Sequence, residues 1–326
     1  MRKLMILAVV AVFCTTMTQI ARGEDVVKPD ENPPAQQPAW ELVTEEAAFS
    51  PRDTAEDCVY DGKMWLSNGY YHGNVLHRDL YASTDGTQWE LINEETPYDG
   101  YSEFVTYKGK MWAVKGSVWT STDGVEWECV CEKTPFGKRG YGETVVFQDK
   151  IWQLGSGDEV WCTEDGVNWT CVTENAPYGG RVAAAVTVYD DKLWLNGGRI
   201  NQPNDPPEEG YEKFTTYNDV WCSEDGANWT RVTEHAPWAP RMWFIAEVYR
   251  GRMWIIGGYD NVNHDNFGDV WYTTDGVRWQ EYPTDNAFSS RHEPTCYVYD
   301  DSLWVVAGNH WPVQNDVWRL TLPEDW

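Results

Sequence analysis

Two kinds of ionisable residue recur at fixed spacings along this chain of 326 residues. An arginine stands thirteen residues before a tryptophan at five places, namely Arg52, Arg139, Arg181, Arg241 and Arg291. Four positions after this register, the first three repeats of the chain carry Glu56, Glu103 and Glu143. Guanidinium groups bind carboxylates through forked hydrogen bonds, and clustered carboxyl groups can hold a cation or transfer a proton. Alternatively, each arginine pairs with local acids or loop carbonyls, and the glutamates hold water and structural ion pairs.

A repeated unit of four short strands spaces these residues. Five copies of Ser/Thr-x-Asp-Gly-x-x-Trp end at Trp89, Trp127, Trp169, Trp229 and Trp279. Ahead of each copy, an apolar run ends in an aromatic residue, and a tryptophan follows five residues later. Turn pairs such as Asp61-Gly62 lie between the two and are typical of a tight hairpin. In the heptad, the Asp can accept hydrogen bonds from the turn backbone and the Gly can supply a positive φ.

Counting these units predicts an all-β fold, a six-bladed β-propeller of four-stranded antiparallel blades over residues 40–326. The last unit supplies three strands and ends at residues 316–320, so we expect a strand around residues 40–43 to complete it. The apolar runs, Gly-Gly pairs such as Gly197-Gly198, and spaced aromatic residues resemble kelch repeats of bacterial exported and galactose-oxidase-like propellers. The heptad resembles a shortened Asp-box. This resemblance implies the fold, places the arginines near the mouth of a central channel, and leaves the function open.

A few residues do not fit the repeat. Of the 21 tryptophans, 17 occupy repeat positions, and the exceptions are Trp238, Trp243, Trp311 and Trp326. In kelch-like propellers the first three map to loops on one face, and the same holds for all six histidines, His72, His77, His235, His264, His292 and His310. The fourth unit also inserts a long segment there, residues 200–218. These features favour a recognition surface, although loops collect polar residues in any protein.

The N-terminus predicts export. Arg2 and Lys3 precede an apolar run, so residues 1–23 are typical of a signal peptide, and residues 24–39 form a proline-rich acidic linker. We therefore expect a secreted or periplasmic protein. The formal net charge of −27 disfavours nucleic-acid binding and membrane insertion.

Metal and cofactor signals are weak. Seven cysteines remain after the leader, none in a Cys-x-x-Cys pair, and we expect them to be buried or incidentally bridged. No phosphate-binding loop, dinucleotide fingerprint or zinc-protease motif is present. The copper ligands of galactose oxidase have no match here. We accordingly predict neither a cofactor nor a metal site.

The leading hypothesis is a non-catalytic propeller that binds a carbohydrate or a protein through its long-loop face. The candidate ligand-binding residues are Arg52, Arg139, Arg181, Arg241, Arg291, His292, His310, Trp238, Trp243 and Trp311. The alternative is an enzyme resembling the kelch-type sialic acid mutarotases (N-acetylneuraminate epimerases). In that case the arginines would hold the sugar carboxylate and a catalytic Glu56, Glu103 or Glu143 would shuttle the proton. A sialidase would need three converging arginines and a tyrosine beside a glutamate.

Overall fold

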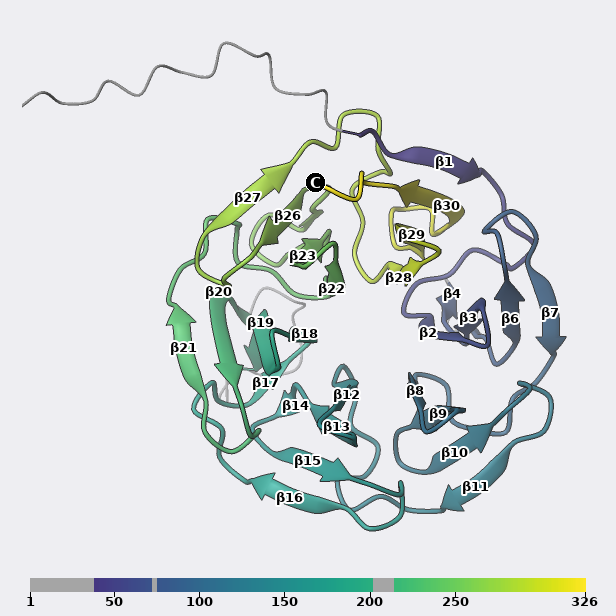
Figure 1. The fold of residues 1–326 in the computed structure, drawn as a ribbon, viewed down its shortest axis with the longest axis vertical. Helices are drawn as coiled ribbons and strands as arrows, with labels where there is room; N and C mark the ends of the chain where they lie inside the picture. Colours follow the sequence, from purple (N-terminus) through teal and green to yellow (C-terminus); the bar gives the residue numbers. More distant parts are fainter. Residues whose placement is uncertain (1–37, 72–74, 202–213) are drawn as a thin grey trace, which may run out of the picture. The chain divides into compact units, whose positions relative to one another are not determined.

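The computed structural model describes residues 38–71, 75–201 and 214–326. These residues form six blades, each built on four antiparallel strands, that follow one another in a ring (Figure 1). The fold is therefore a six-bladed β-propeller, as the repeats predict. The predicted signal peptide, the predicted linker up to residue 37, His72 and most of the long insertion lie outside the described residues. Within the described part, no helix is long and apolar enough to cross a membrane.

The blades follow the chain order, and the strands of each blade run from the centre outward (Figure 1). Blade 1 contains β2 (Glu56–Tyr60), β3 (Lys63–Ser67), β6 (Leu80–Ser83) and β7 (Glu90–Asn93), and blade 2 contains β8 (Glu103–Tyr107), β9 (Lys110–Val114), β10 (Val118–Ser121) and β11 (Glu128–Cys131). Blade 3 contains β12 (Glu143–Phe147), β13 (Lys150–Leu154), β15 (Val160–Thr163) and β16 (Thr170–Thr173), and blade 4 contains β18 (Ala185–Tyr189), β19 (Lys192–Asn201), β20 (Phe214–Ser223) and β21 (Thr230–Thr233). Blade 5 contains β22 (Ile245–Tyr249), β23 (Arg252–Ile256), β26 (Val270–Thr273) and β27 (Trp279–Tyr282), and blade 6 contains β28 (Thr295–Tyr299), β29 (Ser302–Gly308), β30 (Gln314–Leu320) and β1 (Glu41–Thr44).

Among the described residues, three short strand pairs lie on the face that carries the long loops. They are β4 (Tyr70–Tyr71) with β5 (Val75–Leu76), β24 (Tyr259–Asp260) with β25 (Asp265–Asn266), and β14 (Ser156–Gly157) with β17 (Arg181–Val182). The insertion of blade 4 is partly regular, because residues 200–201 and 214–218 extend β19 and β20.

The N-terminal strand closes the ring. Strand β1 pairs antiparallel with β30, placing Glu41 opposite Arg319 and Leu42 opposite Trp318. The first and last parts of the chain thus share blade 6, and the strand predicted around residues 40–43 is confirmed. This pairing covers the edge of β30 that would otherwise be exposed.

The heptad turns hold neighbouring blades together. In blade 1, Asp85 Oδ1 accepts hydrogen bonds from the backbone N–H groups of Thr87 and Gln88, both at 2.8 Å. Gly86 adopts a φ of 71°, and a Cβ on it would lie 2.4 Å from the ring of Trp304 in blade 6. Glycine is therefore required both by the backbone conformation and by the close approach of the neighbouring blade. The same contact recurs in blades 2 to 5.

Blade 6 has no heptad, and the C-terminal tryptophan takes its place against blade 5. Trp326 stacks on Trp254, with ring centroids 5.5 Å apart and an interplanar angle of 25°. The guanidinium of Arg252 lies over the ring of Trp326 and donates a hydrogen bond to the Trp326 carbonyl at 2.9 Å. Trp326, which breaks the repeat in the sequence, thus has a packing role.

Candidate functional site

The recurring arginines are buried inside their blades. The side chains of Arg52, Arg181, Arg241 and Arg291 are at most 2% exposed. Each donates two hydrogen bonds of 2.6–3.1 Å to one aspartate of its own blade, namely Asp79, Asp219, Asp269 and Asp316. Each also donates to a backbone carbonyl sixteen residues further on. The two terminal nitrogens of each guanidinium are therefore hydrogen-bonded within the blade.

The fifth arginine makes the same kind of contact closer to solvent. Arg139 pairs with Glu159, and the two side chains are 24% and 31% exposed. A recess lies at the mouth of the central channel, and none of the five arginines lines it. The arginines do not converge with a glutamate in one pocket. The structural alternative accounts for their placement, because burial and pairing leave no free guanidinium fork for a ligand.

Two positions after the arginine register, each blade carries one residue with a left-handed backbone. These six residues, here called the mouth ring, are Thr54, Tyr101, Tyr141, Ala183, Trp243 and Glu293, with φ between 48° and 62°. This conformation is uncommon outside glycine and is an outlier for a β-branched or bulky residue. Such strain clusters at binding sites when the surroundings enforce it.

Backbone hydrogen bonds enforce the conformation of the mouth ring. The N–H of Ala183 donates to the carbonyl of Tyr141 at 2.9 Å, and the N–H of Trp243 donates to the carbonyl of Ala183 at 3.2 Å. The N–H of Glu293 donates to the carbonyl of Trp243 at 2.8 Å, and the N–H of Thr54 donates to the carbonyl of Glu293 at 3.3 Å. These four bonds cross four successive blade junctions, so the mouth ring is fixed by the closure of the propeller.

All six mouth-ring residues line one recess of about 260 Å³ at the mouth of the central channel. The aromatic residues of the mouth ring are Tyr101, Tyr141 and Trp243, and the rings of Tyr141 and Trp243 are 5.8 Å apart. Below them the recess shares Glu56, Glu103 and other inner-strand residues with the channel. The recess thus combines an aromatic rim with an acidic floor.

Three predicted glutamates form that floor. Burial raises the pKa of Glu56 to about 8, and the charge of Glu103 adds to the rise. Burial also raises the pKa of Glu103 to about 7, although a hydrogen bond of 2.6 Å donated by Thr144 partly lowers it. The pKa of Glu143 is raised well above its usual value by burial and by its acidic neighbours. The structure therefore brings Glu56, Glu103 and Glu143 together, as the sequence predicts.

Several residues of the recess are not indicated by any pattern in the sequence. Asp57 lines it, and burial together with the charge of Glu247 raises the pKa of Asp57 well above its usual value. The cation that lines the recess is Lys115, whose ammonium donates to the carbonyl of Tyr101 at 2.9 Å. Burial lowers the pKa of Lys115, while the charges of Glu103 and Glu56 oppose that change. Residues of the mouth ring differ in type between blades, and only their shared register, two residues after the arginine position, would have identified them.

The off-pattern tryptophans separate into three environments. Trp243 lines the recess and stacks on His292, with ring centroids 5.3 Å apart. Trp238 is 1% exposed and packs on Trp279, so it belongs to the core. Trp311 is 65% exposed and does not line the recess. Of these three predicted ligand-binding residues, only Trp243 is therefore at the recess.

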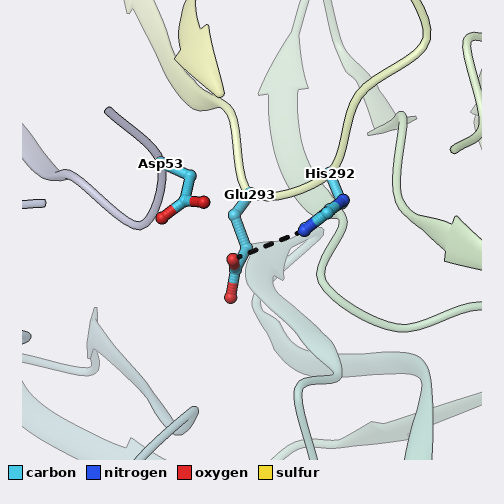
Figure 2. Close-up of side chains that lie close together, drawn as sticks. All are labelled: Asp53, His292 and Glu293. Atoms are coloured by element: carbon cyan, nitrogen blue, oxygen red, sulfur yellow. Dashed lines mark ion pairs between the residues drawn. The ribbon is translucent and has the colours of Figure 1, made fainter. Parts of the chain in front are cut away.

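The histidines of the predicted face also have distinct contacts. His310 Nδ1 lies 2.8 Å from the carbonyl of Ser290. His292 lies at the edge of the recess, in a group with Asp53 and Glu293 whose potential ligand atoms all lie within 4.8 Å of one another (Figure 2). Burial lowers the pKa of His292 to about 4, so its imidazole is neutral at physiological pH. This cluster is the part of the site that could hold a cation.

All seven cysteines in the described part of the chain are free thiols. Cys58, Cys162, Cys222 and Cys296 are buried, whereas Cys129 is exposed and the remaining two are partly exposed. Burial raises the pKa of the Cys58 and Cys296 thiols well above the usual range, which makes them inert.

Comparison with known proteins supports the fold. A solved structure entitled "Structure of YjhT" matches with a TM-score of 0.67 and 12% sequence identity, and the match covers 86% of this chain and 97% of that chain. At this identity the likeness shows a shared propeller fold. The scan of protein-family models and the search of the curated proteins find no match.

Proposed function

We propose that this chain is an exported, kelch-like propeller that binds a neutral carbohydrate unit in the recess at the mouth of its channel. The observation that supports this most is the mouth ring, which places Tyr101, Tyr141 and Trp243 on strained backbones in one recess with buried and half-buried carboxyl groups. Binding residues concentrate on loops held by a rigid scaffold, as these are. We propose a secreted or periplasmic location on the strength of the N-terminal sequence alone.

A sugar fits the chemistry of the recess on both sides. The apolar faces of sugar rings pack against aromatic rings, whereas the hydroxyl groups need several hydrogen-bond partners at once. With pKa values of about 8 and about 7, Glu56 and Glu103 are partly protonated near neutral pH, so each can donate as well as accept. The volume of about 260 Å³ suits a small ligand such as a single sugar ring.

The charges of the recess favour a neutral sugar over an acidic one. Five acidic residues line it, Glu56, Asp57, Glu103, Glu143 and Glu293, and they are accompanied by one cation, Lys115. A sialic acid carboxylate would meet repulsion from those carboxyl groups that remain ionised, and the arginines that would bind it are paired within blades. We therefore do not extend the sialic acid mutarotase and sialidase hypotheses to this chain.

Two tyrosines of similar exposure test the location of the binding site. Tyr141 is 44% exposed and lines the recess, whereas Tyr71 is 41% exposed and lies outside it in strand β4. A glycan array identifies a sugar that binds, and calorimetry then compares the two alanine variants with the unmodified protein. We expect Tyr141→Ala to weaken binding about tenfold and Tyr71→Ala to leave it unchanged, because the loss of one stacked aromatic ring costs up to about 1.5 kcal/mol. Equal effects, or an array without any bound glycan, would overturn the proposal.

The titration behaviour of the floor supports a second candidate function, acid–base catalysis of ring opening in the bound sugar. A general acid or base works best when its pKa lies near the operating pH, and Glu103 with a pKa of about 7 meets this condition. NMR exchange between the anomers of the sugar identified on the array measures such mutarotation. A rate that Glu103→Gln lowers at least a hundredfold supports catalysis, whereas exchange no faster than in buffer excludes it.

A further inference from the structure

Asp53, His292 and Glu293 meet where blade 6 adjoins blade 1. Asp53 precedes β2, and its backbone pairs with that of Tyr70. His292 and Glu293 precede β28, and their side chains lie close to that of Asp53 (Figure 2). His292 Nε2 lies 3.9 Å from Glu293 Oε2. Closure of the propeller thus juxtaposes three potential ligands from opposite ends of the chain.

The hydrogen bonds of His292 determine which ring nitrogen faces the carboxylates. Nδ1 lies 2.6 Å from Asn266 Oδ1, and the amide nitrogen of Asn266 donates to the carbonyl of Asn309 at 2.7 Å. The amide orientation is therefore fixed, so Oδ1 of Asn266 is an acceptor and the imidazole proton must lie on Nδ1. Nε2 then presents a lone pair to Glu293. A second hydrogen bond that fixes the tautomer in this way accompanies most metal-binding histidines.

The carboxylates are arranged in the same manner. Asp53 Oδ2 accepts a hydrogen bond of 2.7 Å from the side chain of Asn309, and Oδ1 accepts one of 3.0 Å from Thr54. Oε1 of Glu293 is buried and has no hydrogen-bond partner in the structure. Three acceptor groups, two carboxyls and an imidazole lone pair, therefore lie together, and the Thr54 hydroxyl is a donor to the two carboxyl groups. Such an arrangement is unfavourable unless a cation or a proton lies between them.

We propose that Asp53, Glu293 and His292 Nε2 bind a divalent first-row transition-metal ion at the edge of the recess. Imidazole nitrogen favours these ions over Mg²⁺ and Ca²⁺, and the two carboxylates neutralise the charge of the ion. Three protein ligands leave coordination positions for water or an incoming ligand. Because Glu293 also lines the recess, the ion lies beside the space proposed for the sugar. The three side chains form this site whether or not the recess binds a carbohydrate.

Titration of the metal-free protein with Mn²⁺ tests this site, since thiolates compete little for that ion. The experiment follows free Mn²⁺ by electron paramagnetic resonance in 0.15 M salt with excess Mg²⁺, which suppresses weak binding to the acidic surface. We expect one tight site per chain, which His292→Gln weakens at least tenfold. His264→Gln is the matched control, because His264 contacts Tyr259 on the same face but lies outside the cluster, and it should bind Mn²⁺ normally.

A spectroscopic measurement on the unmodified protein makes the test independent of how well the variants fold. Electron spin-echo modulation of bound Mn²⁺ should show one directly coordinated imidazole nitrogen. Absence of that nitrogen signal, absence of a tight site, or equal affinity in His292→Gln and His264→Gln would each overturn the proposal. In that event, a proton shared among the three side chains would account for the cluster.

Discussion

Removal of one aspartate from a buried arginine pair should strongly destabilise the propeller. Asp219 accepts hydrogen bonds of 2.7 and 3.0 Å from Arg181 and a third of 2.7 Å from the indole of Trp221. In Asp219→Ala the guanidinium stays 2% exposed without a counter-charge, and the indole N–H loses its acceptor. An uncompensated buried charge of this kind costs about 3–5 kcal/mol. We therefore expect the melting temperature to fall by on the order of 10 °C.

Blade 3 provides the matched control. Glu159 occupies the same position beside Arg139 but is 31% exposed, so Glu159→Ala should cost no more than about 1 kcal/mol. Urea denaturation followed by tryptophan fluorescence measures both losses. The double variant Arg181→Met/Asp219→Leu should regain much of the stability, because it removes the unpaired charge. If Asp219→Ala cost no more than Glu159→Ala, the assignment of these arginines to blade structure would be wrong.

Two further predictions concern the last residue and the channel. Trp326→Ala removes the ring stacked on Trp254 and should lower the free energy of unfolding by about 2 kcal/mol in urea denaturation, whereas exposed Trp311→Ala should change it by less than about 0.5 kcal/mol. Equal changes would refute the packing role of Trp326. Glu103 has its pKa raised by folding to about 7, so its contribution to stability is complete below pH 4.5 and is lost as the pH rises through 7. Between pH 4.5 and 8, the free energy of unfolding should therefore fall by about 3 kcal/mol less in Glu103→Gln than in the unmodified protein. The same pH profile in both proteins would contradict the raised pKa of Glu103.

The sequence predicts the blades well because their determinants are local. A heptad such as that ending at Trp89 contains its own turn, its glycine and its packing ring. Closure by β1 also follows from the sequence, since the last unit lacks one strand. Glu56, Glu103 and Glu143 are found because inner strands share a register around the channel.

The partners of the arginines and the composition of the recess could not be predicted in this way. Arg181 pairs with an aspartate on the third strand of its blade, and the identity of that partner depends on how the loop entering the blade folds back. The six residues of the mouth ring share a backbone conformation but no single residue type, as Thr54 and Trp243 illustrate. Asp53 and Glu293 lie near opposite ends of the chain, so no local spacing indicates that they meet.

A crystal structure of the protein bound to the sugar identified on the array tests the central claim most directly. The proposal predicts density for the sugar inside the recess, with a ring face against Tyr141 or Trp243 and hydroxyl groups within hydrogen-bond distance of Glu56 or Glu103. Density at the outer loops around Trp311, or at another face of the propeller, would contradict it.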